Sequence, residues 1–190
     1  EYKKNIEKPF VCNVNLLSFD KDIANSLKEA KCYEIKVGIE SGSERIRKEV
    51  LNRAITNEKI LEKTEMAHNS GLNISTFNML GLPTETPEEL METLELNSKI
   101  KPRRMKFMIF YPYPLTPAAD LCQRLNLINE NKLRELDNYN TDTPLNFNDK
   151  YMKVFYKVWA NLDHAINSLY NGEYYEMMQN IPGMVLRKER

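Results

Sequence analysis

Glu34-Ile-Lys-Val-Gly-Ile-Glu40, followed at once by Ser-Gly-Ser43, indicates the architecture of this chain more directly than any other stretch. Its first seven residues are rich in β-formers and predict a strand. Ser43 can then cap a helix that carries Ile46 and Val50 on one face. A strand, a polar turn with glycine and a helix thus follow one another without a break, which is the order expected of one βα unit.

The same order of strand and helix repeats on both sides of this unit. The sequence predicts strands over residues 9–17, 34–40, 72–80 and 105–111, and helices over residues 20–30, 56–70, 86–101 and 118–127. The third of these helices has the clearest start signal, because Thr86, Pro87 and Glu89 form a capping box with proline at the first helical position. Strands that alternate with helices are typical of right-handed parallel βαβ units. The predicted fold class is therefore α/β, either a doubly wound sheet or a segment of a (β/α) barrel.

The C-terminal part of the chain has a different character. Residues 138–148 read as a polar connection, and residues 151–170 carry aromatic and aliphatic side chains at three- and four-residue steps, which predicts one long helix. Such a stripe is typical of a helix packed on the sheet or on a neighbouring subunit rather than of a cofactor site. We therefore divide the chain into residues 1–137, with four βα units, and a helical C-terminal extension over residues 138–190.

Composition argues against several classes of function. The 27 Lys and Arg residues equal the 27 Asp and Glu residues, so no overall field of one sign attracts nucleic acid or an anionic membrane. No apolar stretch approaches the roughly 20 residues that span a bilayer. Cys12, Cys32 and Cys122 are odd in number and widely spaced, which fits neither a disulfide framework nor a Cys-x-x-Cys metal site. The sequence therefore predicts a cytoplasmic protein with no metal ligands in this chain.

Three loops are candidates for a ligand site, because ligands of parallel α/β proteins bind at the carboxyl ends of the strands. They are residues 38–43, 81–86 and 111–117. The first combines two glycines with a carboxylate and hydroxyls, the second leads into a helix N-terminus, and the third holds two aromatic rings between prolines. Each loop alone also has an ordinary structural explanation. Together they should meet at one edge of the sheet. Lys101, Arg103, Arg104 and Lys106 precede or begin the last predicted strand, so we expect them at the opposite, amino-terminal edge as a solvated basic cluster.

Five segments of the chain carry a resemblance to a known family. They are Gly-Ile-Glu-Ser-Gly-Ser-Glu (38–44), Asn-Arg-Ala-Ile-Thr (52–56), Asn-Ser-Gly-Leu-Asn-Ile (69–74), Leu-Gly-Leu-Pro-Thr-Glu-Thr (80–86) and Tyr-Pro-Tyr-Pro-Leu-Thr-Pro (111–117). In this order they resemble the C-terminal half of the partial (β/α)6 barrel, a TIM-like barrel, of the radical S-adenosylmethionine (radical SAM) superfamily. They are most similar to its cobalamin-associated and methylthiotransferase-like branches. Thr84 and Leu115 depart from the pattern, since the family usually has glycine at both positions.

The resemblance implies roles for particular residues. Glu40 and Ser41 would contact the ribose and methionine moiety of SAM, and Arg53 the SAM carboxylate. Contacts to the adenine are implied for Met79, Gly81, Tyr111 and Tyr113. The ordinary alternatives are a solvated loop carboxylate for Glu40, a helix-terminal charge for Arg53 and core packing for Met79. No catalytic residue and no metal ligand is assigned in this chain.

The resemblance also implies cofactors that the chain does not hold alone. The superfamily binds a [4Fe-4S] cluster through a Cys-x3-Cys-x2-Cys loop and uses it to cleave SAM reductively to a 5'-deoxyadenosyl radical. The cysteines here lack that spacing, and the cobalamin-associated branch implies cobalamin as a further cofactor. We therefore expect the SAM-binding half of a radical SAM enzyme that is inactive without the cluster-binding N-terminal half. The alternative is a non-catalytic α/β module that binds a nucleotide or docks a partner.

The first predicted strand leads to an expectation about assembly. Residues 9–17 would form an outer strand without its barrel neighbour, and residues 11–17 contain neither a proline nor a charge that would discourage pairing. We therefore expect the isolated chain to form a dimer or oligomer. The substrate, whether a small molecule or a macromolecule, is not identified by any segment of the sequence.

Overall fold

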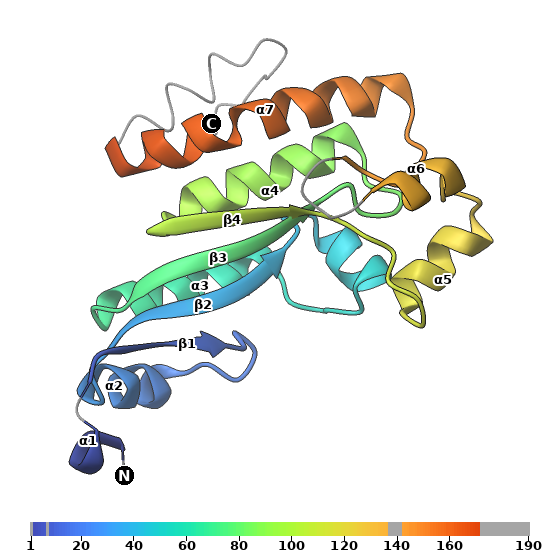
Figure 1. Ribbon diagram of the computed structural model, residues 1–190. Coiled ribbons are helices and arrows are strands. Elements are labelled where there is room, and N and C mark those ends of the chain that lie inside the picture. The colour runs from blue at the N-terminus through green and yellow to red at the C-terminus, as the bar shows by residue number, and fades with distance from the viewer. Residues whose placement is uncertain (1, 7, 137–141, 172–190) are drawn as a thin grey trace.

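The computed structural model describes residues 2–6, 8–136 and 142–171. In this part of the chain one parallel sheet has the strand order β1-β2-β3-β4. The strands are β1 (Phe10–Val14), β2 (Cys32–Glu40), β3 (Asn73–Leu80) and β4 (Arg104–Ile109), and the helices are α1 (Tyr2–Asn5), α2 (Lys21–Glu29), η1 (Ile46–Val50), α3 (Asn57–Asn69), α4 (Pro87–Ile100), α5 (Pro117–Arg124), α6 (Glu130–Glu135) and α7 (Asp149–Asn171). The predicted α/β class with parallel strands is confirmed (Figure 1).

The helices of the βα units begin where the sequence supplies a capping side chain. Asp20 accepts a hydrogen bond from a backbone N–H in the first turn of α2, and Thr56 and Thr116 do the same for α3 and α5. At the start of α4, Thr86 and Glu89 form the complete capping box, with the proline in the first turn. These local signals therefore fix where the chain turns from each strand end into the next helix.

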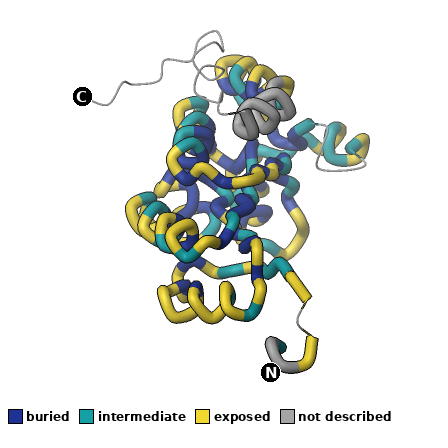
Figure 2. Tube along the Cα trace, turned by 90° about the vertical axis from the view of Figure 1, so that its left-hand side faces the viewer, coloured by how far each residue is buried: buried dark blue, intermediate teal, exposed yellow. Residues whose placement is uncertain are grey.

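One face of the sheet packs against the helices. Ile35, Val37 and Ile39 of β2 and Ile74 of β3 form a buried core with side chains from α2, α3 and α4, among them Ala24, Ile60, Ala67, Leu96 and Ile100. Figure 2 shows the buried residues running through the middle of the molecule, with exposed residues along the outer turns of the helices. The residues of opposite parity, such as Lys36, Gly38 and Phe77, lie on the other face, which we call the inner face.

The long helix α7 extends the helical layer beyond α4. Tyr151, Phe155 and Val158 form a second core with residues of α4 and β4, including Leu90, Leu94, Met105 and Phe107. The first part of the aromatic stripe, from Tyr151 to Trp159, thus packs on the sheet and on α4, which was one of the two arrangements expected (Figure 1). The expected boundary between residues 137 and 138 lies outside the described residues. No helix in the described part of the chain is long and apolar enough to cross a membrane.

Three local expectations differ from the structure. The first strand covers only Phe10–Val14. The helix after Ser43 is a five-residue π-helix, and this wider turn allows Ile46, Arg47 and Val50 all to be buried. Lys106 was expected at the solvated amino-terminal edge of the sheet; it remains exposed but is the third residue of β4, with its ammonium 5.6 Å from the ring centroid of Phe77. The alternation of β4 therefore brings Lys106 onto the inner face.

Candidate functional site

A hollow of about 630 Å³ lies on the inner face toward the carboxyl ends of the strands. Its lining includes Asn13, Lys36, Gly38, Glu40, Arg53 and Phe77. This volume falls in the range of small-molecule pockets, about 300–1,000 Å³. The position agrees with the general rule for parallel α/β proteins, in which ligands bind beyond the carboxyl ends of the strands.

Glu40 and Arg53 form an ion pair in this hollow, with 3.0 Å between Oε1 and the guanidinium. The Glu40 side chain is 14% exposed and that of Arg53 is 52% exposed, so the carboxylate lies inside and the cation at the rim. Burial raises the pKa of Glu40, while Arg53 acts in the opposite direction. A Cβ at Gly38 would lie 2.4 Å from Glu40 Oε1, so the carboxylate folds back over β2 into space that only glycine leaves open.

Arg47 fixes the loop that carries this pair. It is completely buried, and its guanidinium donates to the carbonyl oxygens of Ser41 and Ile55 and to Oδ1 of Asn57. Asn57 in turn donates through its side-chain amide to the carbonyl of Gly42. Burial lowers the pKa of Arg47, yet the three acceptors take up four of its five N–H donors. The backbone from the end of β2 to the start of α3 is thereby held from the inside.

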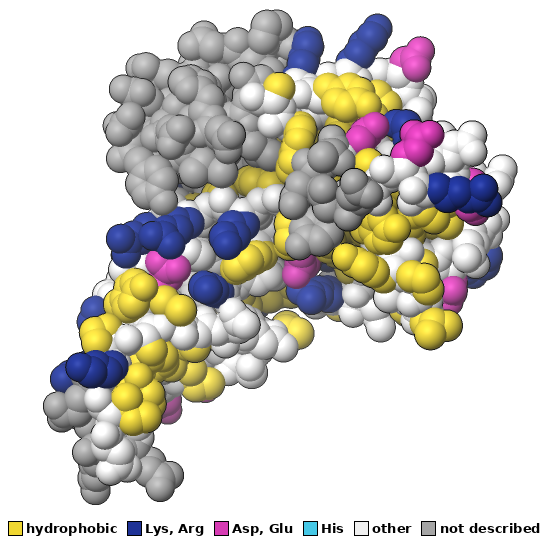
Figure 3. Space-filling model, in the orientation of Figure 1, with side chains coloured by type: hydrophobic (Ala, Val, Ile, Leu, Met, Phe, Trp, Pro, Cys, Tyr) yellow, Lys and Arg dark blue, Asp and Glu magenta, His cyan; other side chains and the backbone are white. Residues whose placement is uncertain are grey.

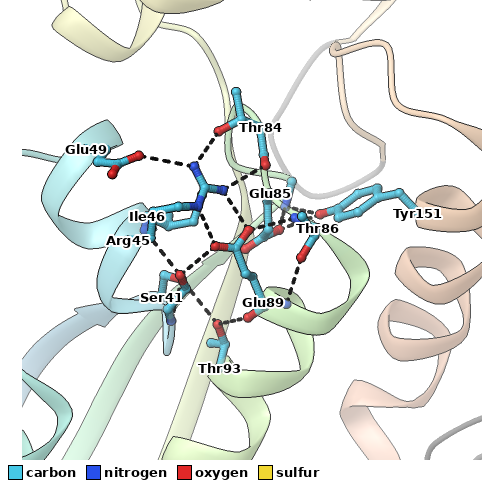
Figure 4. A network of polar contacts seen from close by, with 12 residues as sticks. Ser41, Arg45, Ile46, Glu49, Thr84, Glu85, Thr86, Glu89, Thr93 and Tyr151 are labelled. Atoms are coloured by element: carbon cyan, nitrogen blue, oxygen red, sulfur yellow. Dashed lines mark hydrogen bonds and ion pairs between the residues drawn. The ribbon is translucent and has the colours of Figure 1, made fainter.

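Glu89 joins the loop after β2 to the loop after β3 (Figure 4). Its carboxylate accepts from the Ser43 hydroxyl at 2.8 Å and from the Arg45 guanidinium at 2.8 and 2.7 Å, while also closing the capping box of α4. These donors lower the pKa of Glu89 although burial acts in the opposite direction. Arg45 also donates to the carbonyl of Thr84, so the loops after β2 and β3 share one network of charge-assisted hydrogen bonds.

Glu85 and Tyr151 form a second buried contact at this edge (Figure 4). The Tyr151 hydroxyl donates to Glu85 Oε2 at 2.5 Å, and the backbone N–H of Gly81 lies 2.9 Å from both oxygens. Burial raises the pKa of Glu85 to about 7 and also raises that of Tyr151. Gly81 has φ +73, a conformation that favours glycine, and a Cβ there would meet Thr143 and Phe155 at about 3.5 Å.

The structure brings together only some of the residues that the sequence singled out. Glu40 and Arg53 line the hollow. Ser41 is fully buried, with its hydroxyl 3.5 Å from that of Thr93, and it does not line the hollow. Met79 is half-buried and pairs in register with Met108, which does line it. The roles expected for these residues remain predictions.

The remaining candidates lie outside the hollow. The backbone N–H of Gly81 already donates to Glu85 and Tyr151. Tyr111 and Tyr113 follow β4 and pack on each other, with ring centroids 5.0 Å apart. Tyr113 is exposed and Tyr111 half-buried, so both rings are available near the strand ends without contacting Glu40 in this arrangement.

Sequence reasoning missed the residues that hold the edge together. Arg47, Asn57, Glu89 and Tyr151 were expected as helix or capping residues, and their contacts span up to 70 positions. The charge of Arg47 on the same helix face as Ile46 and Val50 was the available signal. A charged side chain between two core positions must find buried partners.

The described residues contain no group of three His, Cys, Asp or Glu side chains that could hold a metal ion. The sulfur atoms of Cys12 and Cys32 lie 3.8 Å apart, but Cys122 belongs to a different cluster around α5. Burial raises the pKa of Cys12 to about 11. The residues described here therefore do not fit a [4Fe-4S] cluster, which needs several thiolates directed at one site.

Comparison with known proteins places these observations in a family. The sequence model described as "Radical SAM superfamily" matches residues 1–96. An uncharacterized methyltransferase of Pyrococcus horikoshii is 32% identical over 111 residues, which cover 58% of this chain and 24% of that protein. The tRNA-2-methylthio-N(6)-dimethylallyladenosine synthase of Thermotoga petrophila is 37% identical over 98 residues, which cover 50% of this chain and 21% of that protein. The chain thus spans less than a quarter of either relative.

Two solved structures share the fold. Coproporphyrinogen III oxidase (HemN) of Escherichia coli, described as a radical SAM enzyme, superposes with a TM-score of 0.59 at 18% identity and covers 82% of this chain and 32% of that one. The methyltransferase TsrM of Kitasatospora setae, solved with cobalamin and a [4Fe-4S] cluster bound, superposes with a TM-score of 0.51 at 18% identity. The match covers 76% of this chain and 29% of that one. The parallel sheet is therefore a segment of the barrel architecture found in these enzymes.

Proposed function

Because this chain belongs to the radical SAM superfamily, we propose that it provides the SAM-binding edge of the barrel in an enzyme of that superfamily. When bound, SAM supplies the carbon radical that such enzymes use on their substrates. The part played by the residues described here is to bind and orient SAM. The activity of the whole protein is part of the same proposal, because the chain spans only a fraction of its relatives.

The observation that carries the proposal is the Glu40–Arg53 pair in the hollow. A carboxylate that is 14% exposed can accept hydrogen bonds from two neighbouring ribose hydroxyls, and its burial strengthens such bonds. Arg53 at the rim presents a planar fork that suits the carboxylate of an amino acid. The two side chains therefore offer one acceptor for the ribose hydroxyls and one cationic donor for the amino-acid carboxylate of SAM.

The further cofactors are assigned with different support. Since the described residues do not fit a [4Fe-4S] cluster, we place its ligands outside this part of the chain and derive no step through it. Cobalamin is bound in TsrM, which shares the fold, and the sequence resembles the cobalamin-associated branch. We therefore propose cobalamin only for the complete protein.

Binding measurements on the 190-residue chain test the proposal. Isothermal titration with SAM and with 5'-methylthioadenosine, which lacks the amino acid part, separates the two roles. Glu40→Gln should weaken both ligands about tenfold or more, because a charge-assisted hydrogen bond is lost. Arg53→Met should weaken SAM while leaving 5'-methylthioadenosine unchanged.

Glu62→Gln is the matched control, since Glu62 is also a carboxylate in an ion pair but lies on α3, away from the hollow. It should bind both ligands like the unchanged protein. Equal losses in Glu40→Gln and Glu62→Gln, or no measurable SAM binding by the unchanged chain, would refute the assignment of this edge.

We also propose a cytoplasmic location and self-association of the isolated chain. β1 is the outer strand of the described sheet, so one row of its backbone groups has no partner strand there. Sedimentation at micromolar concentration should give a mass above 22.3 kDa. A monomer at all concentrations would contradict this expectation.

A further inference from the structure

Four polar residues form one row across the inner face of the sheet. The registers pair Asn13 of β1 with Lys36 of β2, Lys36 with Ser75 of β3, and Ser75 with Arg104 of β4. In parallel strands, residues in register point to the same face. Lys36 and Arg104 thus lie on one side of the sheet with only Ser75 between them.

The two cations of this row, and Lys106 two residues beyond Arg104 on the same face, have no acidic partner in the described part of the chain. Lys36, Arg104 and Lys106 form no ion pair with any described residue, whereas Arg45, Arg53, Lys59, Lys132 and Lys150 all do. The nearest carboxylate by sequence, Glu34, is buried, and its Oε1 accepts from the Ser75 hydroxyl. Glu34 lies on the same face, two residues before Lys36, so three cations stand against one carboxylate and still raise the local potential for anions.

The hollow and an aromatic ring adjoin these cations. Lys36 and Asn13 line the hollow at its end away from Glu40, and Phe77 and Met108 line its side. Lys106 lies over the Phe77 ring, 5.6 Å from its centroid. Figure 3 shows Lys and Arg side chains gathered over the strands on this face, next to hydrophobic ones.

We propose that the inner face binds an anionic substrate, with Lys36 holding its acid group and with Arg104 and Lys106 adding to the positive potential. The apolar part of the substrate lies on Phe77 and Met108. This inference rests on the proposed function, since it assigns the other end of the same hollow to the substrate. The acid group is a carboxylate or a phosphate, which share this recognition chemistry.

The strand geometry also limits the length of the substrate. Lys36 precedes Glu40 by four residues on β2, which is roughly 13 Å along a strand. If SAM occupies the Glu40 end, the acid group must lie several bonds away from the atom that reacts. A compact anion such as free phosphate can meet Lys36 but does not reach both ends.

Titrations of the ¹⁵N-labelled 190-residue chain, followed by amide chemical shifts, test this site. The probes are phenyl phosphate, phenylacetate and the neutral benzyl alcohol. We expect phenyl phosphate or phenylacetate to bind with shifts centred on β2, β3 and β4, and benzyl alcohol to bind at least tenfold more weakly. The better of the two anions identifies the acid group.

Lys36→Met should weaken the bound anion about tenfold, because one charged hydrogen bond is lost, and Lys36→Arg should retain most of the affinity. Lys21→Met is the matched control, since Lys21 is an exposed lysine on α2, in the helical layer. It should leave the affinity within twofold. An equal loss in Lys21→Met, or benzyl alcohol binding as tightly as the anions, would overturn the proposal.

A parallel SAM titration separates this inference from the proposed function. Lys36→Met should leave the affinity for SAM unchanged, while Glu40→Gln lowers it. If SAM binds in this way but neither anion does, the substrate site is wrong and the SAM edge stands. If an anion binds through Lys36 but SAM binding is absent, the proposed function is wrong, and the site for an anion no longer concerns a radical SAM substrate.

Discussion

The loops after β2 and β3 leave the same edge of the sheet but are built differently. The loop after β2 keeps Glu40 at a hollow, partly exposed and paired with a cation at the rim. The loop after β3 places Glu85 completely inside, where Tyr151 and Gly81 take up one of its oxygens. One carboxylate can therefore exchange its partner for a ligand, and the other is committed to holding α7 on the sheet.

The difference shows how an open site is supported. Ligand groups at Glu40 need a fixed backbone, and Arg47 supplies it from beneath with hydrogen bonds to Ser41 and Ile55. The loop after β3 needs no buried arginine beneath it, because the hydrogen bond between Glu85 and Tyr151, 66 positions apart, fixes this loop to α7. Positioning for binding and sealing for stability are thus divided between neighbouring loops.

Replacement of Arg47 should give the largest effect on stability. Arg47→Met leaves the carbonyls of Ser41 and Ile55 without their donor, so we expect the free energy of unfolding to fall by about 3–5 kcal/mol. Arg47→Lys keeps the charge but loses the planar guanidinium, so its unfolding free energy should lie between those of the unchanged protein and Arg47→Met. Urea denaturation measures both, and a loss below about 1 kcal/mol for Arg47→Met would show that the loop does not depend on this residue.

Glu85 should give a loss of stability that depends on pH. Its pKa is raised to about 7 from 4.5, so the fold favours the protonated carboxyl group. The stabilisation that this group provides is fully present below about pH 4.5 and is lost as the pH rises to 7. The shift corresponds to about 3 kcal/mol. Relative to the unchanged protein, Glu85→Gln should gain about 2–3 kcal/mol between pH 5 and pH 8 in urea denaturation. A difference that is constant with pH would mean that Glu85 is ionised in the fold.

Gly42 should tolerate no side chain. A Cβ there would lie 2.1 Å from the backbone carbonyl oxygen of Glu92, so the β2 loop or α4 must move. We expect Gly42→Ala to cost about 1–3 kcal/mol of unfolding free energy. An unchanged denaturation midpoint would contradict the close approach of this loop to α4.

Gly38 should give the smallest effect on stability and a distinct effect on binding. The atom in conflict with its Cβ is the end of the Glu40 side chain, which can rotate away. Gly38→Ala should therefore change the unfolding free energy by less than about 1 kcal/mol, as expected for an ion pair whose cation is exposed to solvent, while it lowers the affinity for SAM. If Gly38→Ala lowers the unfolding free energy as much as Gly42→Ala does, the Glu40 side chain does not rotate away as expected.

Features that depend on neighbours in sequence were predictable, and those that depend on the path of the loops were not. The capping box joins two residues only three positions apart, Thr86 and Glu89, and was confirmed. The second role of Glu89, with Ser43 and Arg45, joins segments 44 to 46 positions apart. Likewise Tyr151 was recognised as a core residue of a long helix, but its hydroxyl contact with Glu85 has no local signature.

The placement of Lys106 was available from the sequence but was misread. Arg104-Met-Lys-Phe-Met-Ile109 alternates charged and apolar residues at its start, which is the period of a strand with one polar face. Treated as part of a basic cluster with Lys101 and Arg103, Lys106 looked like an edge residue. Period-two alternation is the better guide here, because it assigns a face rather than a position along the strand.

The shared carboxylate of Glu89 has a consequence for protein engineering. A designer who grafts the β2 loop onto another barrel would move Ser43 and Arg45 but leave behind the acceptor that both use. The recipient would then carry a serine and an arginine without their common partner, and a transferred Glu89 must also begin its helix at the same residue to close its capping box. The transplantable unit is therefore the pair of loops with the first turn of α4, and not either loop alone.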